Sequence, residues 1–143
     1  MKAEQMWKES GLEGEYEAWA FGVDADELAR LVLTGVKTAT ASAYPLYELE
    51  GEALPQAGEY SVILNAREEA VCIIRTEKVY VTPCRDVTAE QAWKEGEGDR
   101  SLAYWRRVHK EFFTQEMENA GLAFSEEMGV VCEEFRVVYP REG

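Results

Sequence analysis

The sequence has few of the residues that build metal centres and disulfide frameworks. Among its 143 residues there is one histidine, His109, and there are three cysteines: Cys72, Cys84 and Cys132. An odd number of cysteines without a Cys-x-x-Cys pair, beside a single histidine, fits neither a zinc site nor a set of disulfides. We therefore expect no metal and no cofactor. This cysteine usage is also typical of the reducing cytoplasm, so a cytoplasmic location is expected.

Basic residues are scarce as well. Fifteen Lys and Arg stand against 28 Asp and Glu, which gives a formal net charge of −13. Proteins that hold long nucleic acids through the phosphate backbone are usually basic. The balance therefore disfavours DNA binding and favours a small ligand or a local basic patch. No apolar run reaches the length of a membrane span, and residues 1–10 are too charged for a secretory signal. Nothing in the sequence indicates the oligomeric state.

Length and hydrophobic content, which is 46%, fit one domain with its own core. We expect a single domain over residues 1–143, with residues 1–27 as an N-terminal helical cap and residues 28–139 as the core. Apolar periodicity and capping residues predict helices at 3–10, 24–33, 89–94 and 102–119. Alternation predicts strands at 36–43, 59–66, 70–76, 77–82 and 129–139, and prolines and glycines predict a loop at 44–58. Such an order favours an α+β fold, a mixed β-barrel decorated by helices.

The segment 34–44 organises the rest of the chain. Gly35 stands where a helix ends in a left-handed residue, and a strand of small side chains follows it. Alternation places Thr38, Thr40 and Ser42 on one face and Lys37 on the other, with three alanines. Small side chains allow another backbone or a ligand to come close. A plain helix–turn–strand junction with strand hydroxyls explains the same pattern, and spacing alone does not separate the two interpretations.

Two motifs resemble those of a known family. Gly35-x-Lys37-x-x-Thr40 resembles the signature of the ASCH family, a small β-barrel domain related to the PUA RNA-binding fold. The segment 95–102, followed by Trp105-Arg106 and His109, is similar to the acidic segment and helix of the longer bacterial members. The resemblance extends from about Leu28 to the C-terminus and implies a PUA-like mixed β-barrel.

The resemblance also implies a chemistry. Some small bacterial members are amidohydrolases that remove the acetyl group from N4-acetylcytidine. By resemblance, Lys37, Thr40 and Glu97 would be catalytic: Thr40 attacks the amide carbonyl, Lys37 acts as base, and Glu97 positions the lysine or the leaving amine. Other members are ribonucleases or RNA-binding modules, and a ligand sensor without turnover is a further alternative. Where many members carry a basic residue two positions after the threonine, this chain has Ser42, which weakens any phosphate site.

Further side chains are candidates for contacting the ligand, which we expect to be a nucleoside-like molecule or a short RNA. They carry hydroxyls, carboxylates, aromatic rings or cationic groups, and they are Thr38, Ser42, Tyr44, Glu95, Asp99, Trp105, Arg106 and His109. Each has a structural alternative: Trp105 as core, His109 as a satisfied buried histidine, and the acids as first-turn charges for the following helix. An RNA-binding module would instead present one basic patch of Lys37, Arg75, Arg106 and Arg107 beside an open groove.

Overall fold

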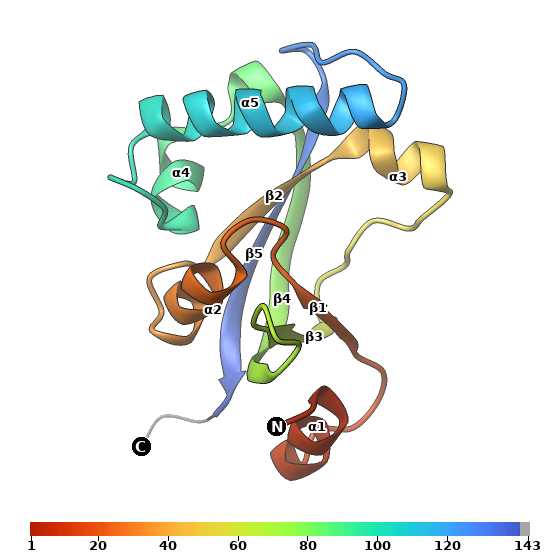
Figure 1. Cartoon of the computed structure of the whole chain (residues 1–143), viewed down its shortest axis with the longest axis vertical. Helices are drawn as coiled ribbons and strands as arrows, with labels where there is room; N and C mark the ends of the chain where they lie inside the picture. Colours follow the sequence, from red (N-terminus) through yellow and green to blue (C-terminus); the bar gives the residue numbers. More distant parts are fainter. Residues whose placement is uncertain (141–143) are drawn as a thin grey trace.

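The fold is a curled five-stranded sheet with helices around it (Figure 1). The computed structural model describes residues 1–140. In chain order the elements are α1 (Ala3–Ser10), β1 (Glu17–Ala20), α2 (Ala25–Leu33), β2 (Ala39–Ala43), α3 (Tyr44–Glu50), β3 (Tyr60–Leu64), β4 (Ala70–Pro83), the 3-10 turn η1 (Cys84–Asp86), α4 (Ala89–Glu95), α5 (Leu102–Asn119) and β5 (Gly129–Tyr139). Within residues 1–140 no helix has both the length and the apolar character that crossing a membrane requires.

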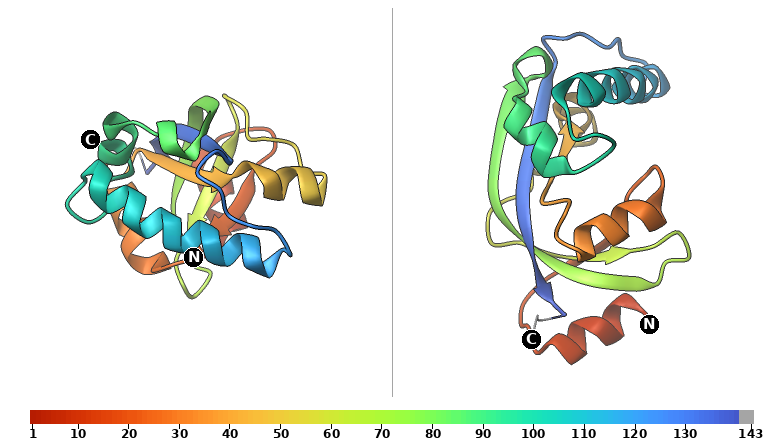
Figure 2. Two further views of the ribbon diagram at one scale, coloured as in Figure 1. Left: turned by 90° about the horizontal axis from the view of Figure 1, so that it is seen from above. Right: turned by 90° about the vertical axis from the view of Figure 1, so that its left-hand side faces the viewer.

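The strands form one sheet in the order β1-β3-β4-β5-β2. β1 runs parallel to β3, and the other neighbours are antiparallel. β4 and β5 are the longest strands, and they run together along the length of the molecule as a bent ribbon (Figure 2). This bent ribbon makes a half-barrel, the PUA-like mixed α+β architecture that the sequence predicts. β2, which carries the candidate residues, lies at one edge of it.

Three apolar cores follow the length of the sheet. At one end α5 packs on β5 and β2, with Trp105 and Phe113 against Val130 and Cys132. In the middle α2 covers β3, β4 and β5 through Ala29 and Val32. Met6 of α1 anchors the third core at the other end of the sheet, where Val62 and Ile73 are buried. Between the first and second cores the chain passes from α2 into β2, and this junction positions the candidate site.

Most expected elements are present, and three segments differ. The predicted loop at 44–58 begins with a helix, α3, because Pro45 occupies the first turn, where its missing N–H costs no hydrogen bond. Residues 17–20, expected to belong to a cap without strands, form β1 and pair with β3. The two predicted runs 70–76 and 77–82 form one strand, β4, with an irregularity between Thr76 and Lys78 that lets the strand bend.

Candidate functional site

Lys37 is buried at the junction between α2 and β2. The helix ends at Leu33, and Gly35 adopts the left-handed conformation predicted for it, with φ at 80°. The backbone N–H groups of Val36 and Lys37 then both donate to the carbonyl of Leu31, at 3.0 Å each. This turn directs the lysine side chain inward, where only 1% of its surface remains exposed. A charged side chain buried to that degree requires partners.

The partners of Lys37 come from the segment that joins α4 to α5. The ammonium Nζ lies 2.8 Å from Oε2 of Glu97 and donates to the carbonyl oxygen of Glu95 at 3.3 Å. It also lies 3.9 Å from Oε1 of Glu95 and 5.4 Å from the centroid of the Phe21 ring. The structure thus brings Lys37 together with Glu95 and Glu97, which lie 58 and 60 residues further along the sequence.

Glu95 is the centre of this network. Its Oε2 accepts hydrogen bonds from Nε1 of Trp105 at 2.5 Å and from Nε2 of Gln91 at 3.1 Å. Its Oε1 faces Nε2 of His109 at 3.4 Å. Burial of the carboxyl opposes its ionisation, but the hydrogen bond from His109 and the charge of Lys37 outweigh it, so the pKa of Glu95 lies below its ordinary value. The group is therefore a buried carboxylate that is fully satisfied.

His109 is held between two acceptors. Its Nδ1 lies 2.9 Å from the carbonyl oxygen of Trp105, and its Nε2 faces the carboxylate of Glu95. Because a carbonyl and a carboxylate only accept, both contacts are satisfied together when both ring nitrogens carry protons. The ring also stacks on Trp105, with centroids 4.1 Å apart and planes 12° from parallel. The carboxylate of Glu95 thus faces both Lys37 and His109, and Lys37 also pairs with Glu97.

Glu97 is more exposed than the other charged side chains of the network, with 24% of its side chain accessible against 13% for His109. It lies between two glycines with positive φ, Gly96 at 72° and Gly98 at 59°. At Gly96 a Cβ would lie 2.6 Å from the carbonyl oxygen of Val36, so only glycine lets the loop approach the residue before Lys37. Arg100 holds the far side of the loop, because its guanidinium donates to the carbonyl of Trp93 at 3.0 Å and stacks on the Trp93 ring.

Thr40 joins the network through its backbone. Its carbonyl oxygen accepts a hydrogen bond from Nε2 of Gln91 at 3.3 Å, and the same nitrogen donates to Glu95. Within the described chain, no hydrogen bond joins the Thr40 hydroxyl to Lys37. Thr40 lies opposite Glu133 of β5 in the ladder. Gln91, which is 2% exposed and also accepts from the hydroxyl of Tyr80, is a residue that sequence reasoning missed. No motif or spacing within the short helix α4 marks Gln91 as a site residue.

The other predicted contact residues lie outside this network of hydrogen bonds. Ser42 pairs with the hydroxyl of Tyr47 at 2.9 Å, and Thr38 Oγ1 donates to the carbonyl of Lys94 at 3.4 Å. Asp99 accepts from the backbone N–H of Ser101 in the turn before α5. The remaining two are Tyr44, which lies against Gly129, and Arg106, which reaches the carbonyl of Arg85. Trp105 and His109, by contrast, are both part of the site and part of the core.

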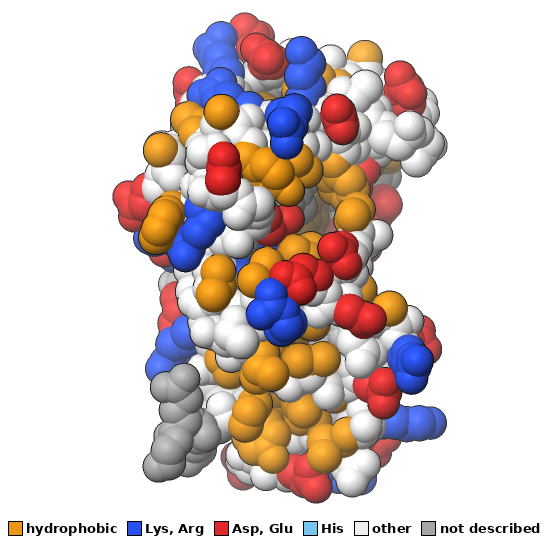
Figure 3. Space-filling view, turned by 60° about the vertical axis from the view of Figure 1, so that its left-hand side comes forward, with side chains coloured by type: hydrophobic (Ala, Val, Ile, Leu, Met, Phe, Trp, Pro, Cys, Tyr) orange, Lys and Arg blue, Asp and Glu red, His pale blue; other side chains and the backbone are white. Residues whose placement is uncertain are grey.

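The surface near the site is hollowed. A depression of about 780 Å³ is lined by Lys37 and Thr38 and by apolar residues of α2 and β5, including Val32 and Phe135. Figure 3 shows a groove that crosses the middle of one face, with hydrophobic and acidic side chains on its walls. The basic patch expected for an RNA-binding module is divided: Lys37 and Arg75 line this depression, whereas Arg106 and Arg107 line a second, smaller hollow.

Residues 1–140 contain no group of three or more His, Cys, Asp and Glu that could hold a metal ion. What the network offers chemically is a buried ammonium beside a partly exposed carboxylate. An ammonium can stabilise a developing oxyanion, and a carboxylate can accept a proton. This pairing suits chemistry at a carbonyl group, provided that a ligand reaches the exposed side of Glu97.

A family model for the ASCH domain matches residues 17–139. The chain belongs to the ASCH-domain family. The matched segment starts at β1 and ends with β5, so it includes the whole sheet and the Lys37 network. The ASCH fold is PUA-like, and the half-barrel seen here agrees with that architecture. Among curated proteins, none matches this chain.

Solved structures of similar chains agree with the family assignment. The ASCH domain from Lactobacillus crispatus JV V101 is 32% identical, with a TM-score of 0.90, and the match covers 95% of this chain and 93% of that one. Protein EF3133 from Enterococcus faecalis V583 is 34% identical, with a TM-score of 0.82, over 94% of this chain and 86% of that one. A hypothetical protein, PH0355, shares the fold at 14% identity and a TM-score of 0.57, over 85% of this chain and 97% of that one.

Proposed function

We propose that this ASCH domain binds a modified nucleoside at Lys37 and hydrolyses an exocyclic amide of its base, with N4-acetylcytidine as the first substrate to test. The observation that supports this most is the 2.8 Å pair between the buried ammonium of Lys37 and the partly exposed carboxylate of Glu97. A nucleoside suits a chain of net charge −13 better than a long polyanion does.

The proposed reaction is acyl transfer. The Thr40 hydroxyl attacks the acetyl carbonyl carbon, Glu97 takes the hydroxyl proton, and Lys37 stabilises the oxyanion. The bond from the carbonyl carbon to N4 then breaks, and N4 leaves with the proton from Glu97. Water next attacks the ester carbonyl on Thr40 and gives a proton to Glu97; the bond to the Thr40 oxygen breaks, Glu97 returns the proton to that oxygen, and acetic acid leaves. Glu97 takes the role of base because the side-chain nitrogen of Lys37 already acts as a donor, to the Glu97 carboxylate at 2.8 Å and to the Glu95 carbonyl at 3.3 Å.

The experiment follows the conversion of N4-acetylcytidine to cytidine by chromatography, with the wild type and the variants Thr40→Ala and Glu97→Gln. We expect both variants to lose about 100-fold or more of the rate, since each removes a group that acts on the reacting atoms. If Thr40→Ala keeps full activity while Glu97→Gln loses it, water is the nucleophile and the role of Thr40 is wrong. If the wild type converts nothing at high enzyme concentration, the proposed reaction on this substrate is wrong.

Binding without turnover is the second candidate, and the burial of Lys37 favours it. With 1% of its surface exposed and two hydrogen bonds to protein oxygens, the ammonium is satisfied without any ligand. A ligand sensor would bind cytidine or N4-acetylcytidine saturably and leave both unchanged. Calorimetric titration with each nucleoside, beside the turnover assay, separates this candidate from the enzyme.

A further inference from the structure

A second hollow lies beside α5, next to η1. It measures about 240 Å³ and is lined by Cys84, Arg85, Arg106, Arg107, Lys110, Phe124 and Glu126. Four of the 15 Lys and Arg of an acidic chain therefore gather around one small cavity. Lys and Arg side chains are also frequent on the upper part of the face in Figure 3, which lies over α5.

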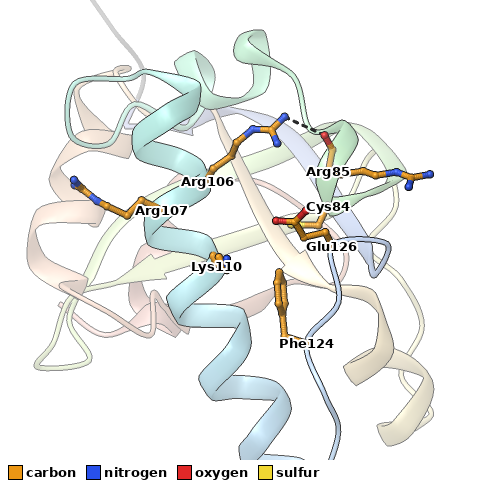
Figure 4. Close-up of a pocket in the computed structure, with 7 residues that line it drawn as sticks. All are labelled: Cys84, Arg85, Arg106, Arg107, Lys110, Phe124 and Glu126. Atoms are coloured by element: carbon orange, nitrogen blue, oxygen red, sulfur yellow. Dashed lines mark hydrogen bonds between the residues drawn. The ribbon is translucent and has the colours of Figure 1, made fainter.

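The cations of this basic hollow come from two elements. Arg106, Arg107 and Lys110 lie within little more than one turn of α5, and Arg85 lies in η1. Arg106 reaches across the hollow, where its guanidinium donates to the carbonyl oxygen of Arg85 at 3.0 Å (Figure 4). Arg85 and Arg107 point outward on opposite sides of the hollow. The positive charge therefore extends in a line across the surface, with its centre at the hollow.

The charges on α5 are not neutralised from within the described chain. In residues 1–140 no carboxylate oxygen lies within 4.0 Å of the side-chain nitrogens of Arg106, Arg107 or Lys110. Arg85 differs, because it pairs with Glu127 at 3.1 Å and lies 4.0 Å from Asp86. Glu126 also lines the hollow and offsets part of the charge. Three cations that form no ion pair within residues 1–140, against Glu126 at the hollow and Asp99, on which the charge of Arg107 acts, leave an excess of positive charge there.

We infer that this basic hollow binds a phosphate group. Arg106 is held in place by its hydrogen bond, so little order has to be imposed on it when an anion arrives. Guanidinium and ammonium groups form charge-assisted hydrogen bonds with phosphate oxygens. The volume of 240 Å³ accommodates a phosphate group with ordered waters, each of which takes about 30 Å³ in the liquid. Phe124 gives the hollow an apolar side, on which a sugar or base can lie.

The phosphate can be carried by a small molecule or by a single strand of RNA. The test uses two probes: inorganic phosphate and an oligouridylate of about eight nucleotides, a length within the usual range for single-strand sites. Binding is followed by two-dimensional NMR of the full chain at two salt concentrations. The test variant is Arg106→Gln with Lys110→Gln. The control is Lys8→Gln with Arg67→Gln, which makes the same change in net charge on the exposed surface elsewhere.

We expect saturable binding of at least one probe by the wild type, a loss of about tenfold or more in the test variant, and no such loss in the control. For the oligonucleotide, the salt dependence should fall by roughly 1.4 in the slope of log K against log salt when two phosphate contacts are removed. Binding of the oligonucleotide alone assigns the site to RNA, and binding of both probes assigns it to the phosphate group itself.

Three results would overturn the inference. They are the absence of saturable binding by the wild type, unchanged binding in the test variant, and equal losses in test variant and control. The inference does not rest on the proposed hydrolysis. Lys110 makes no hydrogen bond to Lys37, Glu95 or Glu97 and is not among the residues expected to contact the nucleoside, so Lys110→Gln alone is expected to weaken phosphate binding and to keep the nucleoside reaction.

Discussion

Glu95 is the residue on which the charges of the candidate site depend. It is 1% exposed, and its carboxylate contacts Lys37, His109, Trp105 and Gln91. Without that carboxylate, Lys37 would keep only Glu97 as a counter-charge, and the ring nitrogens of Trp105 and His109 would lose a buried acceptor. Removal of one partner from a buried ion pair is costly because the charge left behind is no longer compensated.

The first prediction is that Glu95→Gln destabilises the protein by about 3–5 kcal/mol, the usual cost of breaking a buried pair. Urea denaturation at neutral pH measures it. Glu97→Gln is the matched control, because it also removes a carboxylate next to Lys37 but at a position that is 24% exposed. We expect the control to cost less than Glu95→Gln, because Glu97 is partly exposed and Glu95 remains beside Lys37. Equal losses in the two variants would show that Glu95 is not the centre of the network.

The second prediction concerns pH. The pKa of Glu95 is lower in the folded state than its ordinary value of 4.5, so the carboxylate adds stability above pH 4.5. That stability is lost as the pH falls below 4.5 through the folded pKa. The difference in free energy of unfolding between the wild type and Glu95→Gln should therefore shrink on acidification over this range. Urea titrations at pH 7, 4.5 and 3.5 test this expectation, and a constant difference would contradict it.

The pKa of Glu133 is shifted in the opposite direction from that of Glu95: it is raised. Burial is the main reason why the pKa of Glu133 is raised, and the charges of Glu59 and Glu17 add to the rise, although the hydrogen bond from Thr76 lowers it. A raised carboxyl pKa means that stability is full below the unfolded value of 4.5 and is lost as the pH rises through the folded value. The ionised group therefore costs stability at neutral pH.

The third prediction is that Glu133→Gln makes the protein more stable at pH 7 and changes little at pH 4. The glutamine oxygen can still accept the hydrogen bond from Thr76, which is 2.6 Å long in the wild type. Glu134→Gln is the neighbouring control, and it should lose stability at pH 7 because Glu134 pairs with Lys94 at 3.0 Å. Thermal unfolding of the wild type and both variants at pH 7 and pH 4 tests this prediction. A Glu133→Gln variant that is less stable than the wild type at pH 7 would show that the ionised Glu133 does not cost stability.

At the scale of elements, the junction between α4 and α5 determines whether Glu97 reaches Lys37. Gly96 ends α4 in the left-handed conformation, and Ser101 caps α5 by accepting from the backbone N–H of Tyr104. At Gly98 a Cβ would lie 2.4 Å from the ring of Tyr104. The glycines are therefore required by close contacts on both sides of Glu97, and they give the loop one conformation rather than freedom.

The fourth prediction compares Gly96→Ala with Gly51→Ala. Both glycines have positive φ, at 72° and 67°, so both variants pay about 1–2 kcal/mol for the left-handed conformation. Only at Gly96 does a Cβ meet backbone atoms, at 2.6 and 2.9 Å, whereas the space at Gly51 is open. Gly96→Ala should therefore cost roughly twice as much, since overlap adds to strain. Urea denaturation measures the difference, and equal costs would mean that the contact with Val36 is easily relieved.

Elements with a clear period were predictable from sequence, and those that depend on distant partners were not. The helix α5 follows from its Ser101 cap and its apolar face, and the last strand follows from its alternation. β1 is four residues long and exists because β3 offers it a parallel partner, which no local pattern records. α3 was missed because Pro45 indicates either a turn or the first turn of a helix.

At the scale of the whole molecule, the candidate site also combines residues that a local motif predicts with residues that depend on distant partners. Both motifs could be recognised from the sequence, and the hydrogen bonds that join Lys37 to Glu95 and Glu97 are visible only in the folded chain. Gln91 was not predictable because its three hydrogen bonds reach Thr40, Tyr80 and Glu95, which only the folded chain brings together. The division of the expected basic patch between two hollows likewise depends on how α5 lies on the sheet.

The measurement that tests the central claim most directly is the rate of N4-acetylcytidine hydrolysis by Lys37→Met relative to the wild type. Far-UV circular dichroism first shows that the variant is folded. Loss of an ammonium that stabilises an oxyanion should lower the rate by about 100- to 1,000-fold. A folded Lys37→Met variant that converts the substrate as fast as the wild type would contradict a catalytic role for this lysine.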